Sequence, residues 1–299
     1  AVIGASNKPA SVGNALMRNL MGGGFGGPIL PVHPRDAEVA GVKAYADLRD
    51  LPEAPDLAVI ATPADTVADL VARLGARGTR AAVVLTADFG EGGHERGLRR
   101  RQHVLDAARP HLLRVLGPNC LGLAVPGIGL NATFAREAPL PGSIAFLTQS
   151  GGIAVAVLDW ARPRGIGFSA VVSTGGMLDV DFGDLLDYYG ADPATRSIIL
   201  YIEAVTHTRK FMSAARRAAR VKPVIVVKAG RAPQAAKAAA SHTGALAGAD
   251  DVYDAAFRRA GMLRVVEIEE LFDAVATLSR IGMPAGDRLA IVTNGGGPG

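Results

Sequence analysis

The regular alternation of short apolar runs with helical patterns is the feature that most limits how this chain can fold. In the segment 67–74, for example, valine and leucine recur at positions i, i+3, i+4 and i+7, which predicts a helix with one buried face. When helices alternate with strands in this way, the strands pair in parallel and the helices cover both faces of the sheet. The pattern therefore predicts an α/β protein built on parallel sheets.

The apolar runs form two series, separated by a stretch rich in proline and glycine at 123–142. The first series lies at 1–3, 29–32, 57–61, 81–85 and 113–116. The second lies at 143–148, 168–173, 197–202, 223–228, 263–266 and 288–293, with helices expected at about 150–162, 181–190, 208–220, 249–260 and 267–280. A chain of 299 residues has room for about two domains. We expect one domain over 1–126, a second over 127–284, and the first strand and glycine loop of a third α/β domain over 285–299.

Composition and charge exclude several classes of protein. Hydrophobic residues make up 49% of the chain and charged residues 20%, as in a globular protein, and no apolar run is long enough to span a membrane. A single cysteine excludes an internal disulfide framework, and no signal peptide is visible. We therefore expect a cytoplasmic protein that binds no membrane. Because the chain starts inside an apolar run and stops after a glycine loop, we also expect it to be part of a longer protein.

The net charge of +4 does not indicate a nucleic-acid-binding protein. The basic residues are scattered, apart from the run "RRRQH" at 99–103, and aromatic residues make up only 5% of the chain. No nucleic-acid-binding motif is present. We interpret the basic run as the solvated face of a helix.

Polar and glycine-rich segments follow the expected strands of both series. They include "GAS" (4–6), "HPR" (33–35), "TPAD" (62–65), "TADFGE" (86–91), "GPNC" (117–120), "TQSGG" (148–152), "STGG" (173–176) and "IEA" (202–204). Parallel strands end at the same edge of a sheet, and open α/β sheets bind their ligands at that edge. The sequence therefore predicts one ligand site on each domain.

The first turn, "GASNKPASVG", suits a phosphate group at the start of a helix near Ser11. It is neither a dinucleotide fingerprint, because Gly4 and Gly13 are nine residues apart, nor a P-loop, because no G-K-[ST] follows. Arg35 stands after the second strand, where an NAD site places an acidic residue. A basic residue there favours a phosphorylated ribose, as in NADP or coenzyme A. The sequence alone does not decide between these two ligands, and a surface turn without a ligand is the third interpretation.

Cys120 follows the last strand of the first series, in "GPNCLG". A lone cysteine at such a position is usually a small packed residue, and no histidine or acidic partner stands near it in the sequence. We therefore expect Cys120 to be structural and not a nucleophile.

In the second domain, His242 stands in "AAASHTGALAG", among small side chains that let a loop approach a ligand closely. A helix that begins near Ser150 offers free amide groups to an anion. Glu203 ends a strand at the same edge, where its carboxylate could hold one ring nitrogen of His242 and leave the other nucleophilic. Together these residues predict a histidine that accepts a phosphoryl group.

At this point the chain shows a resemblance from end to end. It resembles the CoA-binding, phosphohistidine half of the NDP-forming acyl-CoA synthetases, which include ADP-forming acetyl-CoA synthetase and the α subunit of succinyl-CoA synthetase. The matching segments include "VIGAS", "PVHPR", "LGPNCLGL", "IAFLTQSGG", "KPVIVVKAGR", "AASHTGALAG" and "LAIVTNGGGPG". The SHTG segment together with the TQSGG turn is the most specific part of this match.

The resemblance implies a Rossmann-like CoA-binding domain, then a flavodoxin-like domain with a phosphohistidine loop. It implies that His242 is phosphorylated and that Glu203 steadies it. It places phosphate at Ser150, Gly151, Gly152, Gly175 and Gly176, and coenzyme A at Gly4, Ser6, Gly13, Arg35, Thr62, Pro63 and Asn119. The implied reaction converts acyl-CoA, ADP and phosphate into a carboxylic acid, CoA and ATP through an acyl phosphate. ADP or ATP and Mg²⁺ would bind an ATP-grasp partner subunit or fused domain, in an oligomer, and we expect no metal site on this chain.

Two departures and two alternatives accompany the resemblance. "STGG" stands in place of an SLGN-like segment, and Asp88 stands where the family usually has glycine. The segment "DVDFGDLLDYY" resembles the subgroup that is fused to a GNAT acetyltransferase, in which the same fold senses acyl-CoA for acetylation of protein lysines. An acyl-CoA-sensing regulatory module is therefore one alternative. An NADP-dependent oxidoreductase is the other, and the lack of G-x-G-x-x-G argues against it.

Overall fold

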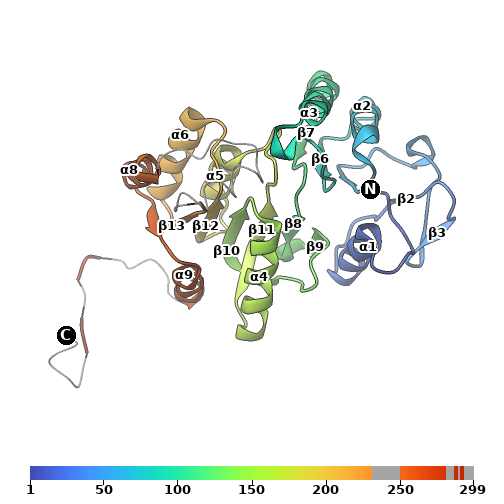
Figure 1. Cartoon of the computed structure of the whole chain (residues 1–299). Coiled ribbons are helices and arrows are strands. Elements are labelled where there is room, and N and C mark those ends of the chain that lie inside the picture. Colours follow the sequence, from blue (N-terminus) through green and yellow to red (C-terminus); the bar gives the residue numbers. More distant parts are fainter. Residues whose placement is uncertain (231–249, 281–285, 289, 293–299) are drawn as a thin grey trace.

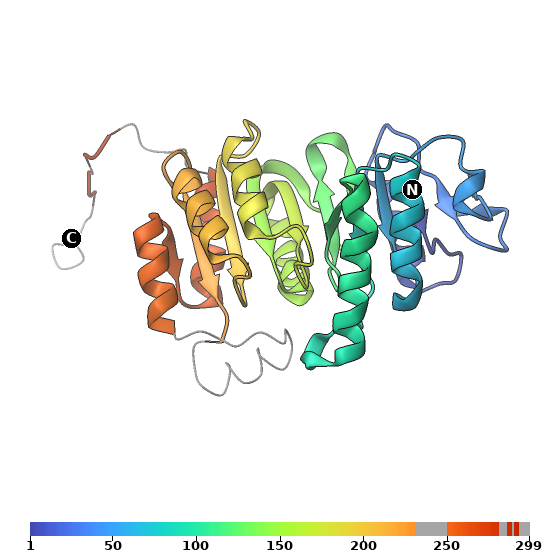
Figure 2. The ribbon, with the colours of Figure 1, turned by 90° about the horizontal axis from the view of Figure 1, so that it is seen from above.

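The computed structural model describes residues 1–230, 250–280, 286–288 and 290–292. Two β-sheets, each covered by helices, lie side by side (Figure 1), and Figure 2 shows the same arrangement from above. In this part of the chain, no helix is both long and apolar enough to cross a membrane. The expected α/β class with parallel sheets is confirmed.

The first unit is a five-stranded parallel sheet with strand order β2-β1-β5-β6-β7. Its strands are β1 (Val2–Ile3), β2 (Pro31–Val32), β5 (Leu57–Ile60), β6 (Ala81–Val84) and β7 (Arg114–Leu116), and its helices are α1 (Val12–Gly22), α2 (Val67–Ala76) and α3 (Glu95–Ala108). A small hairpin, β3 (Glu38–Val39) with β4 (Val42–Lys43), which the sequence did not predict, follows β2. Because all five strands are parallel, the loops that follow them share one edge of the sheet.

Local sequence explains where the helices of this unit begin and which face they bury. The Ser11 hydroxyl caps α1 by accepting a hydrogen bond from the Asn14 amide at 3.2 Å. Leu16, Met17 and Leu20 then form the buried face of α1. Helices α2 and α3 pack together on another part of the core, where Val67, Val71 and Leu74 of the 67–74 pattern are buried and Leu70 is partly buried. The helix predicted from that pattern is therefore confirmed.

The second unit is a seven-stranded sheet with strand order β14-β13-β12-β10-β11-β8-β9. Its strands are β8 (Gly122–Val125), β9 (Leu130–Thr133), β10 (Leu140–Thr148), β11 (Gly167–Ser173), β12 (Ser197–Ile202), β13 (Val224–Lys228) and β14 (Leu263–Val265). Its described helices are α4 (Gly151–Ala161), α5 (Phe182–Ala191), α6 (Thr208–Ala219), α8 (Asp250–Ala260) and α9 (Ile268–Arg280). The five strands from β14 to β11 are parallel, and β8 and β9 add an antiparallel hairpin.

Strand β10 shows why this sheet is buried on both faces. Successive side chains of a strand point to opposite faces. Ile144 and Phe146 belong to the core under α4 and α9, whereas Ala145 and Leu147 belong to the core under α5, α6 and α8. The near-continuous apolar runs of the second series follow from burial on both faces, because a strand covered on one face alone would alternate with polar residues.

The hairpin of β8 and β9 joins the two units. The sequence placed a break in the pattern at 123–142, but most of this stretch is an ordered part of the second sheet, because β8 pairs with β11. The Asn19 side chain of α1 donates hydrogen bonds of 2.8 Å to the carbonyl oxygens of both Thr133 and Ala135. The core under α1 continues into the core of the second unit. The two units are therefore packed against each other and not merely tethered.

The strand expected at 288–293 is wrong at the positions that the structure describes. Residues 288 and 290–292 have no strand pairing. An apolar run becomes a strand only when a neighbouring strand accepts its hydrogen bonds, and no described strand lies beside this one.

Candidate functional site

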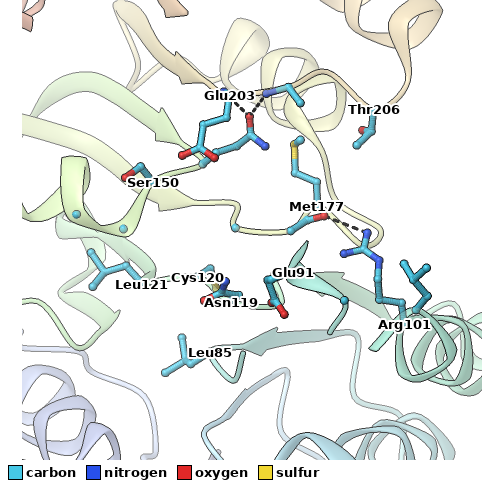
Figure 3. A pocket seen from close by; sticks show the side chains of 18 of the residues that line it. Leu85, Glu91, Arg101, Asn119, Cys120, Leu121, Ser150, Met177, Glu203 and Thr206 are labelled. Carbon is cyan, nitrogen blue, oxygen red and sulfur yellow. Dashed lines mark hydrogen bonds between the residues drawn. The ribbon is translucent and has the colours of Figure 1, made fainter. Parts of the chain in front are cut away.

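A cavity of about 650 Å³ lies where the carboxyl ends of the two sheets meet (Figure 3). Its lining from the first unit and the linking segment comprises Leu85, Gly90, Glu91, Gly93, Leu98, Arg101, Asn119, Cys120 and Leu121. Its lining from the second unit comprises Phe134, Gln149, Ser150, Gly151, Gly152, Gly175, Gly176, Met177, Glu203, Ala204 and Thr206. The sequence predicted a separate site on each domain, whereas the structure makes one cavity from both edges. All five predicted phosphate-binding residues line it.

The start of α4 offers unused hydrogen-bond donors to this cavity. Ser150 caps the helix, because its hydroxyl accepts a hydrogen bond from the Ile153 amide at 3.3 Å. The Thr148 hydroxyl in turn accepts from the Ser150 amide at 3.0 Å. The amides of Gly151 and Gly152 have no acceptor among the described residues. First-turn amides combined with the positive end of the helix dipole make an anion site.

Glu203 lies beside this helix start because Gln149 holds the end of β12 in place. The Gln149 side-chain oxygen accepts hydrogen bonds from the amides of Glu203 at 2.7 Å and Ala204 at 2.8 Å. Figure 3 shows the Glu203 side chain on the same side of the cavity as Ser150. Burial raises the pKa of the neighbouring Tyr201 hydroxyl, and the negative charge of Glu203 raises it further. The sequence quoted Gln149 within TQSGG without giving it a role, so this residue was missed.

His242 lies outside the residues that the structure describes. Its pairing with Glu203 therefore stays a prediction. Two of the three predicted parts of the phosphoryl site, Glu203 and the α4 start, do share the cavity.

The Gly175–Gly176 turn contacts the protein backbone of the first unit. A Cβ atom on Gly175 would lie 2.3 Å from the carbonyl oxygens of both Pro118 and Asn119, and Gly175 has a φ of +51°. The Gly176 amide donates to the Pro118 carbonyl at 2.8 Å. Both glycines line the cavity, but the space beside Gly175 is filled by the neighbouring turn, and a Cβ atom on Gly176 would lie 2.9 Å from the Arg101 side chain. Only glycine permits so close an approach.

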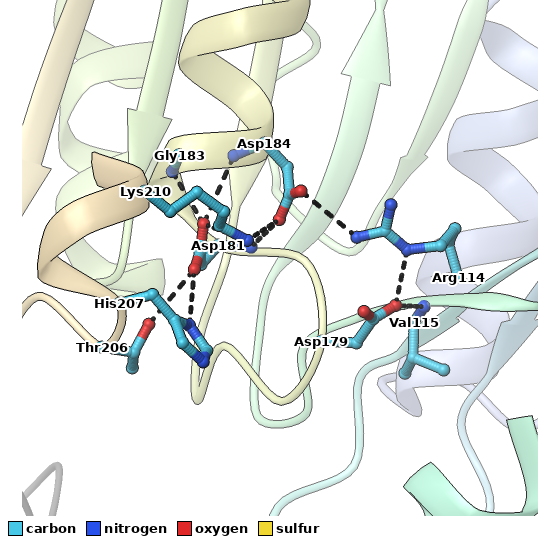
Figure 4. A network of polar contacts seen from close by, with 9 residues as sticks. All are labelled: Arg114, Val115, Asp179, Asp181, Gly183, Asp184, Thr206, His207 and Lys210. Carbon is cyan, nitrogen blue, oxygen red and sulfur yellow. Dashed lines mark hydrogen bonds and ion pairs between the residues drawn. The ribbon is translucent and has the colours of Figure 1, made fainter. Parts of the chain in front are cut away.

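A polar network holds the segment that follows this turn (Figure 4). Asp181 is buried and caps α5 by accepting from the Gly183 amide at 2.7 Å. Its carboxylate also meets the His207 ring at 2.8 Å and the Lys210 ammonium at 3.0 Å. Lys210 bridges to Asp184 at 2.7 Å. The network ties α5 to α6, so the cavity wall from 175 to 181 is anchored at both ends.

The same network reaches the first unit through an arginine. Arg114 of β7 pairs with Asp179 at 2.9 Å and Asp184 at 3.4 Å. The Asp179 carboxylate also accepts from the Val115 amide at 2.8 Å. These contacts fix the position of one sheet edge relative to the other.

Cys120 is structural, as expected. It is buried, and its thiol donates to the Val84 carbonyl at 3.4 Å. Burial raises the pKa of the thiol to about 12, so the nucleophilic thiolate is absent at neutral pH.

Six of the seven predicted coenzyme A residues lie along the carboxyl edge of the first sheet, outside the lining of the cavity. They are Gly4 and Ser6 after β1, Gly13 in α1, Arg35 after β2, and Thr62 and Pro63 after β5. The seventh, Asn119, follows β7 and lines the cavity. Three strand spacings of about 4.8 Å separate β1 from β7, a span of about 14 Å. The predicted residues are therefore spread along the edge, in a line that an extended ligand could follow.

Close packing explains both glycines of the first turn. A Cβ atom on Gly13 would lie 2.0 Å from the Gly4 carbonyl oxygen, and Gly4 itself has a φ of +89°. A Cβ on Gly4 would lie 2.7 Å from the Ala61 carbonyl oxygen. The start of α1 is thereby drawn against the ends of β1 and β5. Thr62 is held at this point by its carbonyl, which accepts from the Thr86 hydroxyl at 2.6 Å.

Arg35 lies in an exposed turn beside this group. The His33 ring nitrogen accepts hydrogen bonds from the backbone amides of Asp36 at 2.9 Å and Arg35 at 3.4 Å. Within the described residues the Arg35 guanidinium has no ion-pair partner. It is therefore available to an anionic ligand, and its contact with coenzyme A stays a prediction.

The basic run at 99–103 is only partly a solvated helix face. Arg100 is half-buried and bridges Asp65 at 2.7 Å and the carboxylate of Asp88. Asp88 has a φ of +75°, a backbone conformation that favours glycine, and its carboxylate pairs with Arg100. Arg101 reaches the cavity. The three consecutive arginines at 99–101 were the only sign of these contacts in the sequence. The interpretation as a solvated helix face did not distinguish the exposed arginine from the two that make contacts.

Comparison with known proteins agrees with this geometry. Residues 1–126 match the family described as a CoA binding domain, and residues 141–278 match the succinyl-CoA ligase like flavodoxin domain. The chain is 43% identical to the α subunit of ADP-forming acetate–CoA ligase I of Pyrococcus furiosus, covering 100% of this chain and 65% of that protein. It is 44% identical to the ADP-forming acetate–CoA ligase I of Archaeoglobus fulgidus, covering 43% of it.

A solved structure shows the same fold. The dinucleotide-forming acetyl-coenzyme A synthetase 1 of Candidatus Korarchaeum cryptofilum, in complex with phosphate and ADP, superimposes with a TM-score of 0.92 at 39% identity. It covers 100% of this chain, which in turn spans 64% of that protein. The chain thus spans less than two thirds of each of these three relatives. Its two parts match the CoA binding domain family and the succinyl-CoA ligase like flavodoxin domain family, and over its full length the chain is similar to ADP-forming acetate–CoA ligases.

Proposed function

We propose that this chain is the CoA-binding and phosphohistidine part of an acid–CoA ligase. The enzyme would interconvert acyl-CoA, ADP and phosphate with a carboxylic acid, CoA and ATP. The observation that carries the proposal is one cavity in which the free amides of Gly151 and Gly152 lie beside Glu203, at the edge where the CoA residues also end. The family membership supports the same chemistry.

The proposed domains are a CoA-binding domain over 1–126, a phosphohistidine domain over 127–284, and the beginning of a third over 285–299. Coenzyme A would lie along the first sheet edge, from Arg35 and Gly4 towards Asn119, so that its thiol end reaches the cavity. The ATP-grasp partner, as a subunit or fused domain, would hold the nucleotide and supply Mg²⁺. Assembly with further copies and a cytoplasmic location belong to this proposal.

We infer the transfer steps from this proposed site. In the direction of ligation, His242 takes the γ-phosphoryl group of ATP, which forms an N–P bond and releases ADP. The amides of Gly151 and Gly152 stabilise the phosphoryl oxygens. Glu203 holds the ring nitrogen of His242 that does not take the phosphoryl group. A carboxylate oxygen of the acid then attacks phosphorus, which breaks the N–P bond and forms an acyl phosphate. The CoA thiolate attacks the acyl carbon, so a thioester forms and phosphate leaves.

Labelling with γ-³²P-ATP and Mg²⁺ tests the proposal in the full protein with its ATP-grasp partner. We expect an acid-labile, base-stable label that the acid and CoA together discharge. His242→Ala should abolish the label, whereas the matched variant His94→Ala, at an exposed position on the first unit, should retain it. An unlabelled wild type that still binds CoA would overturn the proposal and favour an acyl-CoA-sensing module, such as one that regulates a fused GNAT domain.

A further inference from the structure

Arg101 is the only described cavity-lining residue with a positively charged side chain. It extends from α3 of the first unit to the turn of the second unit, where its Nη2 donates to the Gly176 carbonyl at 3.1 Å (Figure 3). That single bond uses only a part of the donor capacity of a guanidinium, which presents a fork of N–H groups suited to a carboxylate.

The charge of Arg101 has no close counter-charge in the described part of the chain. The side chain is half-buried, and no carboxylate lies within ion-pair distance. Burial lowers the pKa of its guanidinium, and the more distant Glu91 opposes that shift. The neighbouring Arg100, in contrast, is paired with two carboxylates, and its pKa is raised. A half-buried cation that faces a cavity without a partner is ready for an anion from solution.

Arg101 and the α4 start lie at different ends of the cavity. Figure 3 shows Ser150 on one side and Arg101 on the other, with Met177 between them. The cavity lining also includes the apolar side chains of Leu85, Leu121 and Phe134, and the carboxylate of Glu91, which accepts a hydrogen bond from the Phe89 amide at 2.7 Å. A ligand that satisfies both ends has a negative group at each end, and its middle part can contact the apolar side chains of the lining.

The phosphates of coenzyme A do not fit this position in the proposed binding mode. They would lie near Gly4 and Arg35, about three or more strand spacings from the end of β7, and each spacing is about 4.8 Å. The part of CoA that reaches the cavity carries no charge besides the thiol. The remaining substrate that can bring a second anion to Arg101 is the carboxylic acid.

We propose that Arg101 binds the second carboxylate of a dicarboxylic acid and thereby sets the substrate class of this enzyme. The inference rests on the proposed ligase function. The reacting carboxylate takes the phosphoryl group at the α4 end, and the other stays ionised against the guanidinium at the opposite end. Arg101 is a specificity-determining residue in this account, and it takes no part in bond breaking.

Kinetics with matched acids test the inference in the full protein with its partner. Straight-chain dicarboxylates are compared with monocarboxylates of the same carbon number, through kcat/KM for thioester formation. Arg101→Leu should lower kcat/KM for the preferred dicarboxylate by about 10- to 100-fold, as expected for a lost charged hydrogen bond. The value for the matched monocarboxylate should change by less than about 3-fold. Arg101→Lys should restore part of the dicarboxylate activity, because it keeps the charge and loses the fork.

Arg99→Leu is the matched control, since Arg99 lies on the same helix but is exposed and pairs with Glu95. It should leave both acids unaffected. An equal loss for both acids in Arg101→Leu would overturn the inference and assign Arg101 to positioning the Gly176 turn. A loss confined to the KM for CoA would overturn it in favour of a CoA contact.

The labelling of His242 separates this inference from the proposed function. A labelled wild type that forms thioesters only from monocarboxylates overturns the inference and leaves the ligase function standing. A wild type with neither label nor thioester overturns both.

Discussion

The glycine pair at 151–152 and the glycine pair at 175–176 line the same cavity, and the sequence assigned both to phosphate. Their surroundings differ. A Cβ atom on Gly151 would meet nothing closer than 3.6 Å, and one on Gly152 nothing closer than 3.8 Å. A Cβ on Gly175 would lie 2.3 Å from two carbonyl oxygens. The first pair leaves room for a ligand, whereas Gly175 leaves room for the neighbouring turn of the protein.

This difference separates two uses of glycine that look alike in sequence. At the α4 start, the missing side chain exposes two amides to the cavity, so the benefit appears in binding. At the 175–176 turn, it permits backbone contact between the two units, so the benefit appears in stability. Substitutions at the two pairs should therefore affect different measurements.

Gly175→Ala should have the largest effect on stability. The clash with two carbonyl oxygens adds to the strain at positive φ, and we expect a loss of about 3 kcal/mol in the free energy of unfolding. Gly24→Ala is the matched control, because Gly24 has a φ of +79° and open space around it. It should lose only about 1 kcal/mol. Denaturant unfolding of both variants measures this, and equal losses would show that the interface contact contributes nothing.

Gly152→Ala should give the opposite result. An alanine in the first turn of α4 is tolerated or better than glycine, so the free energy of unfolding should be unchanged or raised by less than about 1 kcal/mol. Its methyl group would stand where the phosphoryl oxygens approach. We expect the rate of ³²P labelling to fall by about 10- to 100-fold. Normal labelling in this variant would place the phosphoryl group elsewhere.

The wall that carries the second pair should weaken in acid. Burial opposes ionisation of Asp184, but hydrogen bonds from the Asp181 amide and Lys210 outweigh it and hold its pKa below the ordinary 3.8. A lowered pKa in the fold contributes stability above pH 3.8, which is lost as the pH falls further. The side chain is partly exposed, so the contribution is under about 1 kcal/mol. Asp184→Asn should flatten the fall in Tm below pH 4, and an unchanged profile would assign the acid response to other carboxylates.

The smallest effect on labelling is expected at Cys120, which lines the same cavity as the two glycine pairs. With its thiol pKa at about 12, it should resist alkylation at pH 8 in the folded protein and react only after unfolding. Cys120→Ala should retain full labelling and lose about 1 kcal/mol of stability, as for a small buried side chain. Rapid alkylation of the native thiol, or loss of labelling in the variant, would give Cys120 a chemical role.

The sequence predicted the features that depend on hydrophobic periodicity and on parallel strand pairing, namely the strand positions and the residues at the strand ends. The strands at 57–61, 81–85 and 197–202 lie within a residue or two of their observed positions, because burial of one or both faces dictates their apolar patterns. The placement of Ser150 and Glu203 at one edge followed from parallel pairing alone. These residues could be predicted because local pattern and topology agree.

Contacts between the two units could not be predicted. The run at 99–103 gave no sign that Arg100 would pair with Asp65 and Asp88 while Arg101 faces the cavity. The first outcome depends on how α3 packs within the first unit, and the second depends on how α3 meets the second unit. The hairpin at 122–133 was missed because proline and glycine suggested a break. A glycine motif alone also cannot say whether a ligand or a backbone fills the space beside it.

A crystal structure of the full protein with inorganic phosphate would test the central claim most directly. The account predicts a phosphate ion within hydrogen-bond distance of the Gly151 and Gly152 amides, beside Glu203, and none on the amide of Gly176, which already donates to Pro118. Phosphate bound at the 175–176 turn, with the α4 start left free, would contradict it.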